Sequence, residues 1–267
     1  MNSSTAPGPH ISVSGLTMAY GSFVIQRDLS FDVRRGDIFV IMGGSGCGKS
    51  TLLKHMLGLI EPAAGDILYS GENFTRAGAQ QRDAIRRRWG ITYQTGGMFS
   101  AMTLAENVAL PLQLYSDYCP DEIADIVAYK LALVGLAGYQ SFYPAEISGG
   151  MLKRAALARA IALDPEILFF DEPSAGLDPI SSRLLDDLIH ELKESTGATV
   201  VMVTHELPSI FAIATNSVYL DAASRTMIDY GDPAWLRDHS QQPVVREFLT
   251  RGGSPAKATA ARSSQNE

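Results

Sequence analysis

The sequence has little cysteine, no excess of positive charge and no long hydrophobic run. Only two of its 267 residues are cysteines, so a disulfide framework is excluded and a reducing compartment is expected. Lys and Arg number 22 against 29 Asp and Glu, a net charge of −7 that disfavours general nucleic-acid binding. No stretch approaches the roughly 18 consecutive apolar residues of a membrane-spanning helix. Residues 1–10 show neither the positive charge nor the apolar run of a secretory signal.

The composition is that of an ordinary globular protein. Hydrophobic residues make up 46% of the chain and charged residues 19%, which excludes disordered and fibrous classes. At about 150 residues per domain, the length allows one large α/β unit or two domains. We expect a flexible N-terminus over residues 1–9, one domain over residues 10–250, and a disordered tail rich in Ser, Ala and Gly over residues 251–267.

Hydrophobic patterning predicts an α/β fold. β-Branched and aromatic residues separated by glycines predict strands over residues 10–17, 23–33, 37–42 and 66–69, with a helix over residues 50–59. Residues 94–162 are expected to be mostly helical, because apolar residues recur there at helical spacing, and Thr103-Leu104-Ala105-Glu106 fits a capping box at a helix start. Residues 167–170 form a continuous apolar run, typical of a strand buried on both faces of a parallel sheet. A helix over residues 180–194 and a strand over residues 198–203 complete the pattern.

The strongest chemical signal is a glycine-rich loop between a predicted strand and a predicted helix. Its sequence is Gly43-Gly44-Ser45-Gly46-Cys47-Gly48-Lys49-Ser50, followed by Thr51. In this G-x-x-x-x-G-K-S pattern, glycines let backbone N–H groups surround phosphates, and the helix N-terminus adds a favourable dipole. Lys49 is expected to reach the β- and γ-phosphates, and the Ser50 hydroxyl to bind Mg²⁺. A glycine-rich turn without a ligand is the alternative. The complete motif in its required context favours a nucleoside-triphosphate site formed by residues 43–51.

Two adjacent acids end the predicted strand over residues 167–170. In open α/β sheets, the groups that face a ligand lie at the carboxyl ends of the strands. Asp171 is therefore expected to hold the Mg²⁺ ion, and Glu172 to polarise, as a general base, the water that attacks the γ-phosphate. A pair of solvated acids is the alternative, which the phosphate loop in the same chain disfavours.

A third motif, Ser148-Gly149-Gly150, precedes the helix expected over about residues 150–163. With it, the chain resembles the ATP-binding cassette (ABC) ATPases over residues 11–230, because their other elements appear in the same order. These are the phosphate loop, Gln94 after a strand, the Ser-Gly-Gly signature, Asp171-Glu172, Ser174-Ala175-Gly176-Leu177-Asp178, and His205 after a strand. The resemblance implies a P-loop NTPase fold with a RecA-like parallel-sheet core. It also implies an N-terminal antiparallel β-subdomain and a helical subdomain inserted at about residues 95–162.

The resemblance also implies roles outside the phosphate loop. Gln94 corresponds to the loop glutamine that contacts Mg²⁺ and senses the transport partner, and His205 to the γ-phosphate sensor. Ser148–Gly150 correspond to the signature that closes over ATP held by a second copy of the chain, and Asp178 to the residue that links the two sites. Tyr20 corresponds to the aromatic residue that stacks on adenine, a contact that stabilises by about 1–3 kcal/mol. Taken singly, a Gln, His or Tyr is more often an ordinary surface or core residue.

Several shorter stretches resemble one subgroup of the ABC ATPases. The signature continues with Met151 where ABC proteins often have Gln, and Met offers no strong polar contact in its place. With Lys153-Arg154 and residues 94–100, 103–108, 110–112 and 243–249, it is similar to the ATPases of Mla-type phospholipid transporters. The resemblance then implies a homodimer that uses ATP and Mg²⁺, an integral permease, an MCE substrate-binding protein and a small STAS-type regulatory subunit. It places the chain on the cytoplasmic face of the bacterial inner membrane, with no nucleic-acid partner.

Other functions stay open on the sequence alone. A non-transport ABC ATPase acting on ribosomes or DNA usually has two cassettes or a long coiled-coil insertion, and this chain has neither. A P-loop kinase or a switch GTPase is disfavoured by the signature, the paired acids and the lack of an Asn-Lys-x-Asp guanine reader. A transporter ATPase for a different cargo is a further alternative, because the lipid interpretation rests on the shorter stretches.

Two features suggest functions that the rest of the chain disfavours. Arg82 and Arg86-Arg87-Arg88 suggest a nucleic-acid patch, but in an acidic chain a basic run is more often a solvated helix face. Cys47 suggests a redox switch, but it occupies a variable position of the loop motif where a small side chain is tolerated.

Overall fold

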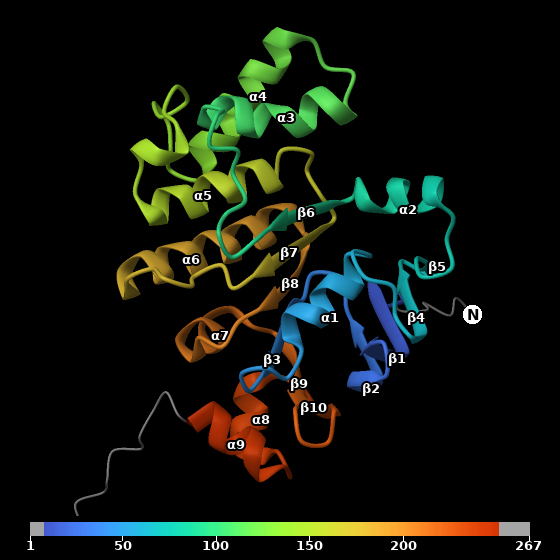
Figure 1. Cartoon of the computed structure of the whole chain (residues 1–267). Helices are drawn as coiled ribbons and strands as arrows, with labels where there is room; N and C mark the ends of the chain where they lie inside the picture. Colours follow the sequence, from blue (N-terminus) through green and yellow to red (C-terminus); the bar gives the residue numbers. More distant parts are fainter. Residues whose placement is uncertain (1–7, 251–267) are drawn as a thin grey trace, which may run out of the picture.

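Two β-sheets organise residues 8–250, which are the residues that the computed structural model describes (Figure 1). The larger sheet has the strand order β10-β9-β3-β8-β7-β6. Its strands are β3 (Ile38–Gly43), β6 (Trp89–Thr92), β7 (Ile167–Asp171), β8 (Thr199–Val203), β9 (Asn216–Asp221) and β10 (Thr226–Gly231). All neighbours are parallel except β10, which pairs antiparallel with β9. The α/β class is therefore confirmed. The segments expected to be flexible lie outside the described residues, apart from residues 8 and 9.

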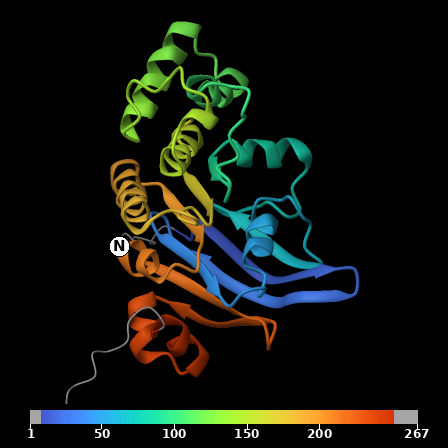
Figure 2. The same cartoon turned by 60° about the vertical axis from the view of Figure 1, so that its left-hand side comes forward.

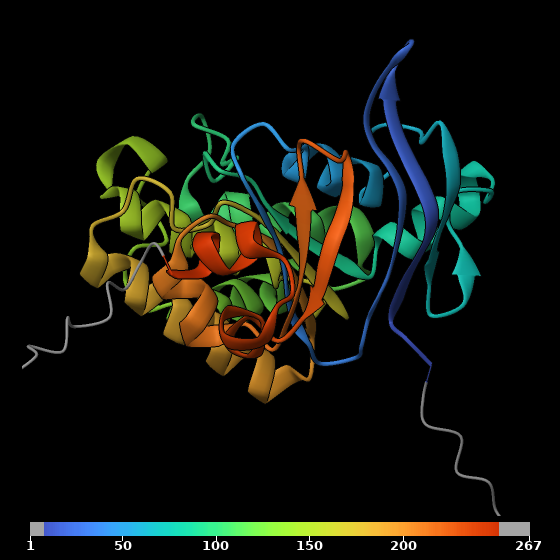
Figure 3. The same cartoon turned by 90° about the horizontal axis from the view of Figure 1, so that it is seen from below.

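The smaller sheet is antiparallel and N-terminal, as the resemblance implies. Its order is β2-β1-β4-β5, with β1 (Ile11–Tyr20), β2 (Phe23–Val33), β4 (Ala64–Tyr69) and β5 (Glu72–Asn73). The β1–β2 hairpin extends away from the larger sheet (Figures 2 and 3). Phe31 of β2 stacks on Phe39 of β3 with ring centroids 5.3 Å apart. The Tyr230 hydroxyl donates to the Asp32 carbonyl at 2.7 Å, so direct contacts join the two sheets.

The larger sheet separates two hydrophobic cores, because successive residues of a strand point to opposite faces. Ile38, Val40 and Met42 of β3 pack on the side of the long helices. Phe39 and Ile41 pack on the other side, with helix α1 (Lys49–Met56) and the smaller sheet. All six residues of β3 are buried. The loop that follows β3 therefore starts from a fixed position between the two cores.

Helices cover the face of the larger sheet opposite α1. They are α5 (Gly149–Ala160), α6 (Pro179–Thr196), α7 (Leu207–Ile213), α8 (Pro233–His239) and α9 (Pro243–Thr250). The last two pack on each other beside the β9–β10 edge (Figure 3). None of the helices described within residues 8–250 is both long enough and apolar enough to cross a bilayer.

The expected helical region forms one end of the molecule (Figures 1 and 2). It contains α3 (Leu104–Tyr115), α4 (Pro120–Leu133) and α5, while α2 (Ala79–Arg86) lies beside the smaller sheet. The capping box predicted for α3 is confirmed: the Glu106 N–H donates to the Thr103 hydroxyl at 3.2 Å, and the Thr103 N–H donates to the Glu106 carboxylate at 2.7 Å.

Element ends differ from the sequence prediction by up to three residues. Helix α5 ends at Ala160 instead of continuing to residue 163, because the chain tightens there into turns: the Ala162 N–H donates to the Arg159 carbonyl and the Asp164 N–H to the Ile161 carbonyl, both at 3.2 Å. Asp164 then takes a positive φ of 49° before Pro165. Helix α6 is longer than expected. The Asp178 side chain caps its start, and Gly197 ends it with a φ of 70°.

The basic residues in and just after α2 form ion pairs with acidic residues of the same chain. Arg82 forms an ion pair with Glu61, and Arg88 pairs with Glu72 at 2.6 Å. The Arg82 guanidinium also lies over the Phe74 ring, 5.4 Å from its centroid. These contacts agree with a solvated, ion-paired helix face.

Candidate nucleotide-binding site

The phosphate loop joins β3 to α1, and close contacts require two of its glycines, Gly43 and Gly48. Gly43 has a φ of 147°, and a Cβ there would lie 2.4 Å from the Leu220 carbonyl oxygen. Gly48 has a φ of 103°, and a Cβ there would lie 2.8 Å from a methyl group of Ile25. Since real Cβ atoms do not approach so closely, both positions are restricted to glycine.

Two side chains hold the phosphate loop: Lys49, which belongs to the loop motif, and Gln26 of β2. The Lys49 ammonium donates to the Gly43 carbonyl at 3.0 Å and to the Gly44 carbonyl at 3.1 Å, so it lies across the loop. Beneath it, the fully buried Gln26 donates to the Cys47 carbonyl at 2.7 Å and to the Asp221 carbonyl at 3.0 Å. Sequence reasoning missed Gln26, because nothing in its local sequence reveals a partner 195 residues away.

Cys47 is a packing residue in this structure. Its thiol is buried, and burial raises the pKa of the Cys47 thiol. A buried thiol with a raised pKa is a poor nucleophile. The geometry agrees with a tolerated small side chain and gives no support to a redox switch.

The two acids after β7 have different partners. Asp171 accepts a hydrogen bond from the Ser50 hydroxyl at 3.1 Å, which joins the strand end to the start of α1. Glu172 has a strained left-handed φ of 50°, and its Oε1 lies 2.8 Å from Nδ1 of His205. Because a carboxylate only accepts, Nδ1 must carry the hydrogen. The other oxygen, Oε2, is buried without a hydrogen-bond partner among the described residues.

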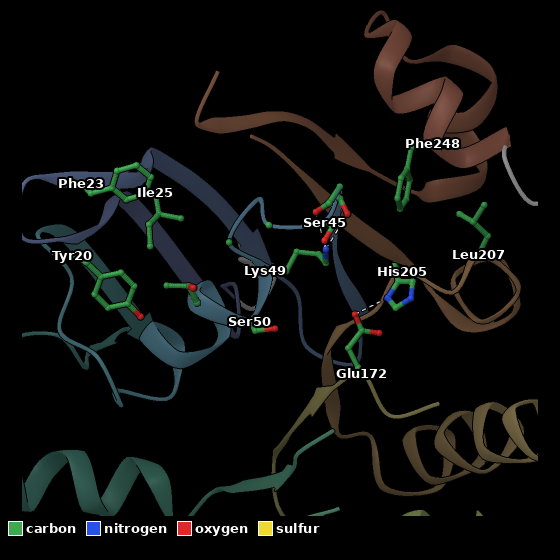
Figure 4. A pocket seen from close by; sticks show the side chains of 15 residues that line it. Tyr20, Phe23, Ile25, Ser45, Lys49, Ser50, Glu172, His205, Leu207 and Phe248 are labelled. Atoms are coloured by element: carbon green, nitrogen blue, oxygen red, sulfur yellow. Dashed lines mark hydrogen bonds and ion pairs between the residues drawn. The ribbon is translucent and has the colours of Figure 1, made fainter. Parts of the chain in front are cut away.

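The phosphate loop, Glu172 and His205 line one pocket of about 810 Å³, a size typical of small-molecule sites (Figure 4). Eleven of the expected site residues line it: Tyr20, Gly43, Gly44, Ser45, Gly46, Gly48, Lys49, Ser50, Thr51, Glu172 and His205. Figure 4 shows Tyr20 on one side of the loop, with Glu172 and His205 on the other. This arrangement matches a nucleotide with its base at Tyr20 and its terminal phosphate toward Glu172.

Four further lining residues were not anticipated: Phe23, Ile25, Leu207 and Phe248. Phe248 comes from α9 and packs against Tyr219, 5.3 Å between ring centroids. The sequence marks residues 243–249 as family-like without indicating that they reach the phosphate loop, because a contact over 200 residues leaves no local pattern.

Several expected site residues lie outside this pocket. The expected residues that do not line it are Cys47, Gln94, Ser148–Gly150, Asp171 and Asp178. Ser148 and Asp178 are exposed helix caps: the Ser148 hydroxyl accepts from the Met151 N–H at 3.3 Å, and Asp178 accepts from the Ser181 N–H at 3.0 Å. Hydrogen bonds from Ser181 lower the pKa of Asp178. One chain thus assembles only part of the expected site.

The donors available for a divalent cation are few. Within residues 8–250 no group of three or more His, Cys, Asp or Glu side chains comes together as a metal cage. Ser50 and Asp171 offer two oxygen donors beside the loop. Mg²⁺ is usually held by one or two protein oxygens with phosphate and water as the remaining ligands, so this pair fits it. Gln94, expected as a third ligand, lies outside the pocket.

Comparison with known proteins agrees with this geometry. A model of the "ABC transporter" family matches residues 26–175. The chain is 41% identical to the intermembrane phospholipid transport system ATP-binding protein MlaF of Haemophilus influenzae, over 90% of this chain and 89% of that protein. It is 40% identical to the probable ribonucleotide transport ATP-binding protein mkl of Mycobacterium leprae, over 91% of this chain and 69% of that protein.

Solved structures show the same fold. The cbiO1 subunit of the cbiONQ ABC transporter complex of Clostridium perfringens superposes with a TM-score of 0.78 at 25% identity, covering 91% of this chain and 95% of that one. A dimeric bacterial ABC transporter cassette superposes with a TM-score of 0.75 at 26% identity, covering 83% of this chain and 98% of that one. The chain belongs to the ABC transporter family and is one of its ATPases.

Proposed function

We propose that this chain is the ATP-hydrolysing subunit of a transporter that moves phospholipids between the inner and outer bacterial membranes. The observation that carries the catalytic part is a single pocket in which a phosphate loop faces Glu172 and His205. The phospholipid part rests on the 41% identity to MlaF over nearly the full length of both chains.

Within the pocket, each side chain has a chemical task. Lys49 and the loop N–H groups would neutralise the β- and γ-phosphates, displacing the ammonium from its present carbonyl partners. Ser50 and Asp171 would hold Mg²⁺, which when bound neutralises charge that develops on the phosphates. Tyr20, with 55% of its surface exposed, has a free face on which adenine can stack.

Glu172 is suited to the proton transfer. Its Oε1 is engaged by His205, which fixes the carboxylate plane. Because Glu172 lines the pocket, its carboxylate can accept the proton of a water there as that water bonds to the γ-phosphorus. In this assignment His205 orients the base and contacts the γ-phosphate.

Two copies would complete two sites. Ser148–Gly150 lie at the exposed N-terminus of α5, where backbone N–H groups are available to an anion, and they lie outside their own chain's pocket. We infer that they close over the γ-phosphate bound to the other copy, with Asp178 linking the two sites. A related cassette has been solved as a dimer bound to ADP and Pi, which supports this arrangement.

Further partners follow from the transporter assignment. No described helix crosses a membrane, so an integral permease would supply the pathway. Two exposed aromatic side chains of the loop that carries Gln94, Tyr93 and Phe99, offer a surface for it. An MCE substrate-binding protein and a STAS-type regulatory subunit are proposed by analogy with the Mla system. The chain would then work at the cytoplasmic face of the inner membrane.

The phospholipid cargo has a specific alternative, which an experiment can distinguish. The relative mkl, at 40% identity, carries a ribonucleotide-transport name, so another cargo is the specific alternative. We would purify the chain with its bound partners from detergent-solubilised membranes, identify the proteins by mass spectrometry, and analyse bound lipids and nucleotides. Copurification of a permease with bound phospholipid, and hydrolysis stimulated by that complex, are expected. A permease that carries ribonucleotides would contradict the lipid assignment, and stimulation by ribosomes or DNA would contradict transport.

A further inference from the structure

The loop that carries Gln94 has no regular structure of its own. Residues 93–103 connect β6 to α3 without a strand or an α-helix. Gly96 and Gly97 both take positive φ, at 77° and 63°. Backbone carbonyls in such a segment need partners from elsewhere. The residues that bond to these carbonyls determine which helix moves together with the Gln94 loop.

Two cationic side chains of α5 supply those partners. The Arg159 guanidinium donates to the Gly97 carbonyl at 2.7 Å and to the Gly96 carbonyl at 3.2 Å, while the Lys153 ammonium donates to the Gln94 carbonyl. Positions three or four residues apart share one face of a helix. The face that bears Lys153 and Arg159 also bears Ala156, which lies 3.7 Å from the position of a Gly96 Cβ.

The far end of the loop is fixed to α3. Asn107, which is fully buried, accepts from the Phe99 N–H at 2.8 Å and donates to the Phe99 and Thr103 carbonyls at 3.1 and 2.9 Å. The Arg159 guanidinium lies 5.9 Å from the centroid of the Phe99 ring. The loop is therefore held by the helical region at both ends of its irregular stretch.

The two acids after β7 also influence the charge of Lys153. Burial lowers the pKa of the Lys153 ammonium, while the negative charges of Glu172 and Asp171 oppose that shift. Lys153 thus donates to the Gln94 backbone, while the two acids after β7 favour its charge.

We propose that Arg159, assisted by Lys153, is a positioning residue that fixes the Gln94 loop to α5, so that Gln94 and the Ser148–Gly150 signature move as one unit. The signature is the first turn of the same helix. A permease that displaces the Gln94 loop would then displace the signature that completes the other copy's site. This inference rests on the proposed role of Gln94.

The chain offers a matched control on the same helix. Arg154 also donates to a backbone carbonyl, that of Val134 at 2.9 Å, but it holds the end of α4 instead of the Gln94 loop. We would compare Arg159→Met with Arg154→Met in the full chain within its copurified membrane complex. The measurements are ATP affinity, kcat and KM for hydrolysis, and thermal stability.

Arg159→Met is expected to lower kcat by about 10- to 100-fold, the range associated with misplacing a reacting group by about 1 Å. Its ATP affinity should stay near the wild-type value, because every residue of the nucleotide pocket is intact. Arg154→Met should leave kcat near wild type. Arg159→Lys should restore part of the rate, since an ammonium can donate to one of the two carbonyls.

A double-variant comparison separates positioning from general damage. If Arg159 acts through Gln94, the rate of Gln94→Ala/Arg159→Met should equal that of Gln94→Ala, whereas independent damage would multiply. If Arg159→Met proves unstable, Lys153→Met in the same comparison gives the same test. Equal kcat for Arg159→Met and Arg154→Met, beside a slow Gln94→Ala, would overturn the positioning role alone. A wild-type rate for Gln94→Ala would overturn the role of Gln94 and this inference with it.

Discussion

The phosphate loop and the signature, the two proposed halves of the nucleotide site, are built in opposite ways. The phosphate loop contacts one sheet at each end, Gly43 against Leu220 of β9 and Gly48 against Ile25 of β2, and no Cβ fits at either glycine. The signature, Ser148–Gly150, lies at an exposed helix start, and a Cβ on Gly149 would meet nothing within 4 Å. One half is complete within a chain, whereas the other has open space that a second copy would fill.

The strongest test of this difference mixes two inactive chains. Lys49→Ala removes the phosphate-binding ammonium from one half, and Ser148→Arg blocks the other half by size and charge. Each variant alone should lose at least about 100-fold in ATP hydrolysis, as expected when a charge-stabilising donor is removed or the second half cannot close. A one-to-one mixture should recover hydrolysis, because a mixed dimer contains one site with both halves intact.

ATP binding by each variant and two contrary outcomes complete the mixed-dimer test. ATP binding should be lost in Lys49→Ala and kept in Ser148→Arg, which filter binding can measure. A mixture that stays inactive, or a Ser148→Arg chain that hydrolyses ATP normally by itself, would contradict a site shared between copies.

Glycine substitutions sharpen the contrast at the level of folding. Gly43→Ala places a Cβ 2.4 Å from the Leu220 carbonyl and should lose at least about 3 kcal/mol of unfolding free energy, or fail to fold. Gly149→Ala sits on a helix in open space and should change stability by less than about 1 kcal/mol. Urea unfolding monitored by circular dichroism measures both. Equal urea midpoints for the two variants would contradict the difference in packing between Gly43 and Gly149.

A third test concerns α6, the helix capped by Asp178. Burial raises the pKa of Asp186 on this helix to about 6, above the roughly 3.9 of an unfolded chain. Above the folded pKa the carboxylate is ionised and costs stability, and the cost falls as pH drops toward the unfolded value. Asp186→Asn should therefore raise the unfolding free energy by about 1–3 kcal/mol at pH 8 and by about half as much at pH 5.

The control for this test is Asp187→Asn, which removes the same charge from an exposed neighbour. It should change stability little at either pH. If Asp186→Asn destabilised the chain at pH 8, Asp186 would be stabilised as an anion in the folded chain. An effect that is equal at pH 8 and pH 5 would show that the pKa of Asp186 is not raised.

The smallest expected effect separates helix capping from signature function. Ser148→Ala removes the cap of α5 and should cost about 1 kcal/mol of stability as well as slowing hydrolysis. Thr103→Ala removes the cap of α3 and should cost about the same stability while leaving hydrolysis near wild type. Thermal unfolding and ATPase assays distinguish the two. Parallel losses of activity in both variants would mean that Ser148 acts only as a cap.

The sequence predicted best what depends on neighbours along the chain. The phosphate loop, the two acids after β7 and the capping box at Thr103 are local patterns, and the structure shows the strand, loop and helix context expected for each. The division of side chains between two cores also follows from strand periodicity.

Residues that act across long sequence distances were not predictable. Gln26, which supports the loop from beneath, and Phe248, which lines the pocket from α9, are recognised only when the fold brings them together. The same holds for Arg159, 62 residues from its Gly97 carbonyl. Conversely, Gln94 is easy to recognise by its place after a strand, but the structure leaves it outside the pocket.

The central claim is that two copies clamp ATP between the phosphate loop of one and the signature of the other, and that Glu172 then drives its hydrolysis. Glu172→Gln keeps the shape of the side chain while removing the base. With ATP and Mg²⁺, light scattering after gel filtration should show twice the mass of one chain, with ATP retained and no phosphate released. A monomer that binds no ATP, or hydrolysis at the wild-type rate, would contradict the account.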